Sequence, residues 1–125
     1  MKKIILFLLF FILSGCQSGK FSNATDITIK GTGYEGEKAG KLCGMFKLNQ
    51  DQVKTYFKKA KQIDSDEAHH DHDYYSCWVH GGLKYQGANC TWSIDIGGLA
   101  NVQCNGKEYV TYCKSCESFM LDQIP

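Results

Sequence analysis

The chain contains no arginine, and this absence narrows the partners that it can bind. All 14 basic residues are lysines, and 13 acidic residues balance them, so the formal net charge is only +1. Nucleic-acid interfaces need a strongly basic surface, and arginine supplies the two-pronged contacts to phosphate that lysine cannot make. The composition therefore disfavours a nucleic-acid partner.

The sequence also lacks the short motifs that mark common catalytic sites. It contains no Gly-x-Ser-x-Gly nucleophile motif, no P-loop for phosphate and no His-Glu-x-x-His zinc motif. Five of its 13 acidic residues cluster in the linker over residues 64–73 and not on facing strands. We therefore predict a protein that is not an enzyme.

The sequence has no apolar run long enough to cross a bilayer. The longest, Ile4–Leu13, is about ten residues long, whereas a membrane-spanning helix needs about 20. Lys2 and Lys3 precede this run and small residues follow it, which is typical of a secretory signal peptide. We predict that the segment is cleaved after export.

The residues at the end of the run, Leu13-Ser14-Gly15-Cys16, resemble the lipobox of bacterial lipoproteins. In that motif the cysteine receives a lipid and becomes the first residue of the mature chain. The resemblance implies a signal peptide over residues 1–15 and a lipidated Cys16. Residues 16–25 are polar and small, which predicts a flexible tether, and residues 26–125 then form a single domain.

Six cysteines remain beyond the predicted lipid site, and an even number in a small exported domain indicates a disulfide framework. Up to three bridges are expected. The six residues are Cys43, Cys77, Cys90, Cys104, Cys113 and Cys116.

One amphipathic helix is predicted from about residue 50 to residue 63. Asn49 can cap its first turn and Gln52 can reach back to Asn49, which forms a capping box. Apolar residues then recur at helical spacing, with lysines at the other positions. This pattern predicts one face packed on the core and one face in solvent.

From residue 77 the apolar pattern alternates with a period of two, which predicts strands over residues 77–85, 90–96, 99–104 and 108–113. Glycine-containing turns separate them. A further short strand over residues 26–30 is followed by a glycine-rich stretch that reads as a loop. The predicted fold is α+β, with one amphipathic helix packed on a four-stranded antiparallel meander and stapled by disulfides.

A hairpin that turns at Gly97 places residues whose numbers sum to 194 opposite each other. This register brings Cys90 opposite Cys104, so we predict a bridge between them. For the other four cysteines, Cys113–Cys116, Cys43–Cys77 and a bridge from Cys116 to the helix side all stay open.

The linker after the helix is the most unusual segment by composition, because it holds three histidines and five carboxylates within residues 64–73. Imidazole and carboxylate ligands suit zinc or copper, which makes the segment a candidate metal site. A solvated surface turn is the simpler interpretation. The candidate ligands are His69, His70, Asp71, His72 and Asp73.

Two further features could carry a function. Cys113 and Cys116 have the spacing of thioredoxin-like redox pairs, but they follow a strand instead of opening a helix, which favours a structural bridge. Trp78 and His80 alternate on one predicted strand, and exposed aromatic residues on that face would form a binding surface.

Several segments together look like a group of small bacterial lipoproteins of unknown function. They are the region from Cys43 to Ala60, the run His-Asp-x-Asp-Tyr-Tyr-Ser-Cys-Trp-Val-x-Gly, Trp92-Ser-Ile, and Tyr112-Cys-Lys-Ser-Cys116. The likeness covers about residues 43–116. It implies an envelope protein and brings no activity with it. In a Gram-negative bacterium, Gln17 after the lipidated cysteine resembles the signal for the outer membrane, facing the periplasm.

These features lead to one main functional hypothesis and two alternatives. The main hypothesis is a lipid-anchored, non-catalytic binding module of the cell envelope whose partner is another envelope protein, a toxin or hydrolase that it inhibits, or peptidoglycan. The first alternative is a metal-binding lipoprotein that uses the histidine-rich linker with zinc or copper. The second is a thiol–disulfide enzyme that works through Cys113 and Cys116.

Overall fold

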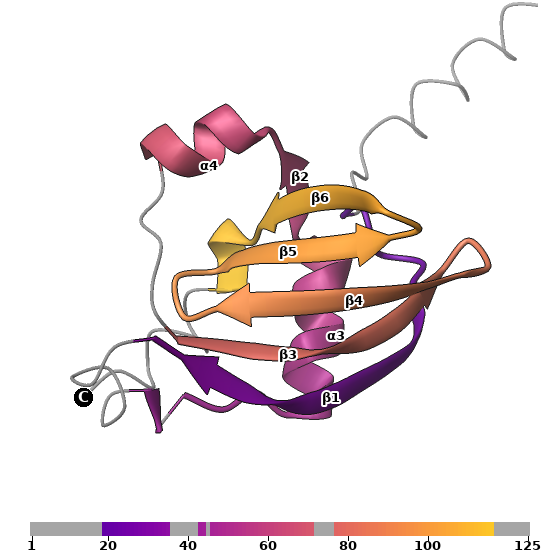
Figure 1. The fold of residues 1–125 in the computed structure, drawn as a ribbon, viewed down its shortest axis with the longest axis horizontal. Helices are drawn as coiled ribbons and strands as arrows, with labels where there is room; N and C mark the ends of the chain where they lie inside the picture. The colour runs from indigo at the N-terminus through magenta and orange to yellow at the C-terminus, as the bar shows by residue number, and fades with distance from the viewer. Residues whose placement is uncertain (1–18, 36–42, 45, 72–76, 117–125) are drawn as a thin grey trace, which may run out of the picture.

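A computed structural model describes residues 19–35, 43–44, 46–71 and 77–116 of the chain. Its main feature is a six-stranded antiparallel sheet with helix α3 across one face (Figure 1). The strands lie in the order β1-β3-β4-β5-β6-β2. The elements are β1 (Thr25–Tyr34), α3 (Gln50–Lys59), β2 (Lys61–Ile63), α4 (Ser65–Asp71), β3 (Cys77–Tyr85), β4 (Ala88–Asp95), β5 (Leu99–Cys104), β6 (Lys107–Tyr112) and a 3₁₀ turn, η2 (Lys114–Cys116).

The predicted four-stranded meander is wrong, because the sheet has an additional strand at each edge. On one side β1 pairs with β3 and runs to Tyr34, through the glycine-rich stretch that the sequence suggested was a loop. On the other side β2 pairs with β6, placing Ile63 opposite Val110. The described chain also contains a second helix, α4.

Helix α3 begins as predicted and ends earlier. Asn49 accepts a hydrogen bond from the backbone nitrogen of Gln52, and the Gln52 side chain accepts one from the backbone of Asn49, so the capping box is confirmed. Ala60 adopts an extended conformation (ψ 129°), which stops the helix and directs residues 61–63 into β2. The predicted last turn of the helix is therefore an edge strand.

The central strands follow the register that the sequence predicted. Cys90 lies opposite Cys104, Trp92 opposite Val102, and Ile94 opposite Ala100. Tight turns with positive φ at Gln86-Gly87 and Asn105-Gly106 flank this region, and such turns match the twist of paired strands.

Residues 19–24 are attached to the folded body, so the described part of the predicted tether over residues 16–25 is not a free segment. The backbone nitrogen of Gly19 donates to the Lys58 carbonyl oxygen (2.9 Å), and that of Lys20 donates to the Ala60 carbonyl oxygen (3.2 Å). Phe21 is only 1% exposed, and its ring packs edge-on against those of Phe57, Tyr85 and Tyr109. One aromatic side chain in a polar segment thus ties residues 19–24 to the core.

Candidate functional site

The sheet has one face covered by α3 and one face free of described elements (Figure 1). We call the second face the open face. Residues on the covered face are apolar and buried, for example Val79, Trp92 and Val102. Their neighbours in the strands point to the open face and are mostly polar; on β3 to β5 these are Trp78, His80, Thr91, Ser93, Asn101 and Gln103.

Two glycines on β1 leave space for two aromatic rings on the open face. Trp78 pairs with Gly33 and His80 pairs with Gly31 on β1. A methyl group at Gly33 would overlap the indole ring, and one at Gly31 would lie 3.3 Å from the imidazole Nε2. The strand predicted over residues 26–30 is thus the first half of β1, and the glycines that obscured its second half make room for both rings, which stay partly exposed.

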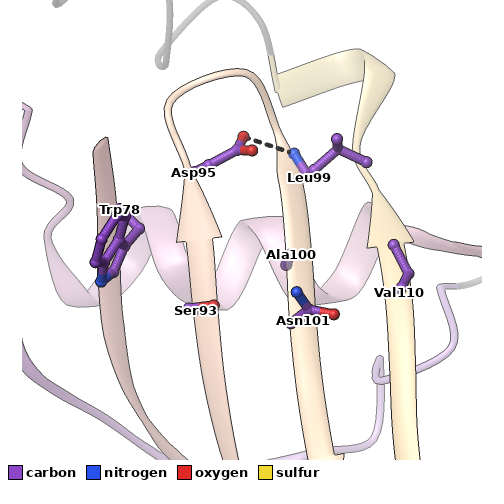
Figure 2. Close-up of a pocket in the computed structure, with 7 residues that line it drawn as sticks. All are labelled: Trp78, Ser93, Asp95, Leu99, Ala100, Asn101 and Val110. Atoms are coloured by element: carbon purple, nitrogen blue, oxygen red, sulfur yellow. Dashed lines mark hydrogen bonds between the residues drawn. The ribbon is translucent and has the colours of Figure 1, made fainter. Parts of the chain in front are cut away.

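Two adjoining cavities of about 140 and 330 Å³ open on this face. Both are lined by Ser93 and Asn101, so together they form one shallow groove across β3, β4 and β5. Figure 2 shows Trp78, Ser93, Asn101 and Val110 side by side on consecutive strands, with α3 behind them. We call this feature the open-face groove; the second cavity adds Lys30, His80, Gly81, Thr91, Trp92 and Gln103 to its lining.

Asn101 is the most informative residue of the groove. Its side-chain oxygen is buried and has no hydrogen-bond partner among the described residues. A buried polar atom without a partner costs free energy, so such atoms are rare in folded proteins. A ligand that donates a hydrogen bond to this oxygen, once the side chain turns toward the groove, would remove that cost.

The acidic residue beside the groove has a structural role. Asp95 is buried, and one carboxylate oxygen accepts hydrogen bonds from the backbone nitrogens of Gly97 (2.9 Å) and Leu99 (3.1 Å). These contacts hold the turn between β4 and β5 (Figure 2). The carboxylate is therefore committed to the turn, and the groove residues Ser93, Asn101 and Gln103 supply uncharged groups.

The cysteines form three bridges: Cys90–Cys104, as the register predicted, Cys43–Cys77 and Cys113–Cys116. The last two were among the open possibilities. Cys113 and Cys116 are 1% and 0% exposed, which keeps their sulfur atoms away from thiols in solution. This burial favours a structural bridge over redox exchange.

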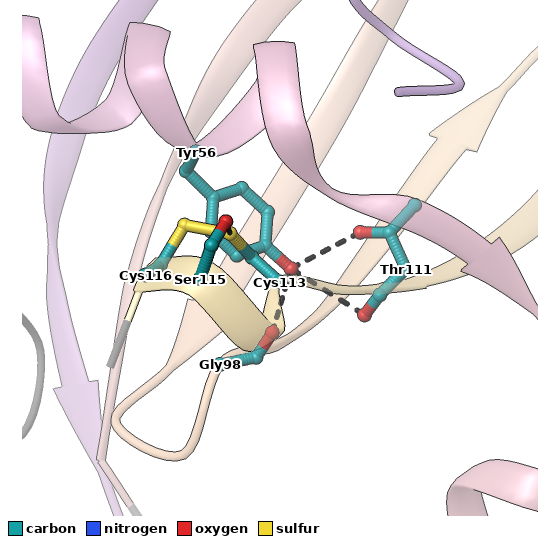
Figure 3. The surroundings of a disulfide bond; sticks show 6 residues. All are labelled: Tyr56, Gly98, Thr111, Cys113, Ser115 and Cys116. Carbon is teal, nitrogen blue, oxygen red and sulfur yellow. Dashed lines mark hydrogen bonds between the residues drawn. A yellow bond between two sulfur atoms is a disulfide. The ribbon is translucent and has the colours of Figure 1, made fainter. Parts of the chain in front are cut away.

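Tyr56 of α3 lies beside this bridge (Figure 3). Its hydroxyl donates to the Gly98 carbonyl oxygen (2.8 Å) and lies 3.1 Å from the Thr111 hydroxyl oxygen. Burial raises the pKa of Tyr56 far above its usual range, so the phenol stays protonated and fastens the helix to the sheet.

The structure describes three of the five predicted metal ligands. His69, His70 and Asp71 belong to α4, whose first turn is capped by Asp64 through the backbone nitrogen of Glu67 (2.6 Å). His72 and Asp73 lie outside the described residues, as does the predicted lipid site Cys16. Within the described chain no group of three or more histidine, cysteine or acidic residues could hold a metal ion.

A cleft of about 540 Å³ lies where β2, α4 and η2 meet. It has mixed charge and no nucleophile paired with a base; the lining residues are Lys59, Lys61, Ile63, Glu67, Tyr112, Lys114 and Ser115.

Trp78 and His80 were identified from the sequence as a candidate surface, whereas Ser93, Asn101 and Gln103 were not. The alternation along the strands places these three on the face opposite Trp92 and Val102, and that signal was available. The sequence gives no signal for the unpaired oxygen of Asn101, because that feature depends on how neighbouring side chains pack.

No family model, curated protein or solved structure matches this chain. The resemblance to small envelope lipoproteins thus stays a prediction. None of the helices within the described ranges is both long enough and apolar enough to cross a membrane.

Proposed function

We propose that the protein is a lipid-anchored, non-catalytic binding module of the bacterial envelope, and that it binds its partner in the open-face groove. The anchor follows from the signal-like residues 1–15 and from Cys16, as argued above. The observation that carries the binding role is the buried, unpartnered side-chain oxygen of Asn101, which lies in a groove beside the partly exposed ring of Trp78.

The groove suits a ligand that is rich in hydroxyl groups. A sugar ring has apolar C–H faces that can stack on an indole ring, and hydroxyl groups at its rim that can reach neighbouring side chains. Trp78 offers the flat ring, and Ser93, Asn101 and Gln103 offer hydroxyl and amide partners. In the envelope this chemistry matches the glycan strands of peptidoglycan, which we take as the ligand.

A protein partner, such as a toxin or hydrolase that the module inhibits, is the competing occupant of the groove. Ser93, Asn101 and Gln103 favour glycan, because their hydroxyl and amide groups beside the ring of Trp78 match a sugar better than they match the apolar centre of a protein interface. The metal-binding alternative has no supporting observation in the described residues and stays a prediction.

Sedimentation of the mature protein with purified peptidoglycan sacculi tests this function. We expect wild-type protein to sediment with sacculi, and Trp78→Ala to bind at least tenfold more weakly because it removes the stacking ring. Tyr34→Ala is the matched control, since Tyr34 is an exposed aromatic residue (57%) that lies outside the groove.

Two results would contradict the proposal in different ways. Equal sedimentation of wild type and Trp78→Ala would remove the groove from the binding site. A photo-crosslinker at position 78 that captures one envelope protein in cells, with no sedimentation on sacculi, would keep the groove and replace glycan by protein as the ligand.

A further inference from the structure

The short distance between the predicted lipid and the folded body limits how the body can sit on a membrane. Gly19 is already hydrogen-bonded to Lys58, and Phe21 is in the core. Only Gln17 and Ser18 separate Gly19 from Cys16. Three steps between Cα atoms span at most about 11 Å, so a lipid on Cys16 would hold the body close to the bilayer.

Four lysines lie around residues 19–24, the segment that follows the predicted lipid site. The ammonium groups of Lys20 and Lys107 lie 5.2 and 5.3 Å from the centroid of the Tyr109 ring. Lys54 and Lys58, one helical turn apart on α3, line a small cavity against the turn that contains Phe21. We call Lys20, Lys54, Lys58 and Lys107 the basic collar.

The four collar lysines outnumber their three acidic neighbours, which are Asp26, Asp51 one helical turn before Lys54, and Glu108 next to Lys107. Asp26 lines the same cavity as Lys54 and Lys58, and its carboxylate lies 3.8 Å from the ammonium group of Lys84. The collar therefore carries a local excess of positive charge, although the whole chain is nearly neutral.

We propose that the basic collar docks on anionic phospholipid headgroups of the bilayer that holds the lipid on Cys16. This inference rests on the lipid anchor of the proposed function. The short connection keeps the collar within about one Debye length of the headgroups, where physiological salt screens the attraction only in part. Lysine suits this contact because its long side chain can extend a point charge toward a phosphate. Each lysine strengthens binding to an anionic surface by about fivefold.

Docking of this kind leaves the open-face groove accessible. Lys107 lies opposite Cys104, whose side chain is buried on the covered face, and Lys54 and Lys58 belong to α3 on the same side. Trp78 and Asn101 lie on the other side of the sheet (Figure 2). The collar thus turns the helix side toward the membrane and the groove away from it.

Lysine footprinting on the full-length acylated protein tests the collar. The protein is placed in nanodiscs of neutral phosphatidylcholine or of phosphatidylcholine with about one third phosphatidylglycerol, and each lysine is acetylated and followed by mass spectrometry. We expect the four collar lysines to react at least threefold more slowly on the anionic discs, and this protection to disappear in 1 M salt, where the Debye length is about 3 Å. Lys30, at the open-face groove, is the internal control and should react equally on both discs.

A variant with all four collar lysines changed to glutamine provides a second readout. Spin labels placed in the open-face groove should report one orientation for wild type on anionic discs and a broad distribution for the variant, with Lys30→Gln as the matched control. Acylated protein whose collar lysines react equally on both discs would overturn the collar and leave the anchor intact. Protein that carries no acyl group on Cys16 and does not enter discs would overturn both the anchor and the collar.

Discussion

Replacement of Phe21 by alanine tests whether residues 19–24 belong to the folded body. The Phe21 side chain is 1% exposed, and its ring centroid lies 4.8 Å from that of Tyr85 and 5.6 Å from that of Tyr109. Truncation of a buried phenylalanine costs about 3–5 kcal/mol, including the cavity that it leaves. Because residues 19–24 can detach as a unit and recover chain entropy, we expect about 2–4 kcal/mol here.

The assay is equilibrium unfolding in urea with the three disulfides intact. Phe21→Leu keeps most of the apolar volume and should cost about 1 kcal/mol, and Tyr34→Ala, at an exposed position, should stay within about 0.5 kcal/mol of wild type. A Phe21→Ala protein as stable as the Tyr34 control would show that residues 19–24 are a free tether. The membrane orientation inferred from the basic collar would then fail as well.

Three further outcomes follow from the contacts described above. Tyr56→Phe should lower the free energy of unfolding by about 1–3 kcal/mol at pH 7, since the Gly98 carbonyl loses its buried donor. Because burial raises the pKa of Tyr56, the unfolded chain releases this proton near pH 10 and the folded chain does not. Above pH 10 the stability of wild type should therefore fall more steeply than that of the variant, by up to about 1.4 kcal/mol per pH unit, which urea unfolding at several pH values can measure. The buried Cys113–Cys116 bridge should resist millimolar dithiothreitol followed by alkylation unless denaturant is present, and rapid reduction in the native state, seen by mass spectrometry, would restore the redox alternative. Gly33→Val should displace the Trp78 ring and weaken sedimentation with sacculi as much as Trp78→Ala does; unchanged binding would show that the position of the ring does not matter.

The central hairpins could be predicted because local signals agree there. Glycine turns fix the register, and alternation along β4 separates Trp92 and Ile94 from Ser93. The same register predicts the Cys90–Cys104 bridge. Short-range sequence patterns therefore suffice for neighbouring antiparallel strands.

The alternation over residues 26–30 predicted the first half of β1, but the second half of β1 and the whole of β2 could not be predicted, because their signals are not local. Strand β1 continues through Gly31 and Gly33, residues that weaken an isolated strand but are required here by the rings of His80 and Trp78 on β3. Strand β2 is three residues long and continues the apolar spacing of α3, so only its pairing with β6 distinguishes it from helix.

The sequence predicted only part of the candidate site, because some of its signals are local and others are not. Aromatic residues at alternate positions on β3 identify the face, and polar residues at alternate positions on β4 and β5 share it. The groove itself depends on the tertiary packing that buries the Asn101 oxygen without a described partner. Such a feature has no signature in a single sequence.

The most direct test of the binding role is an NMR titration of the ¹⁵N-labelled mature protein with soluble glycan fragments of peptidoglycan. If the open-face groove binds glycan, the indole N–H of Trp78 and the side-chain amide of Asn101 should shift progressively, while amides of α3 on the covered face should not. Signals of Trp78 and Asn101 that stay unchanged at millimolar glycan, or shifts confined to α3, would contradict the proposal that this groove is the binding site.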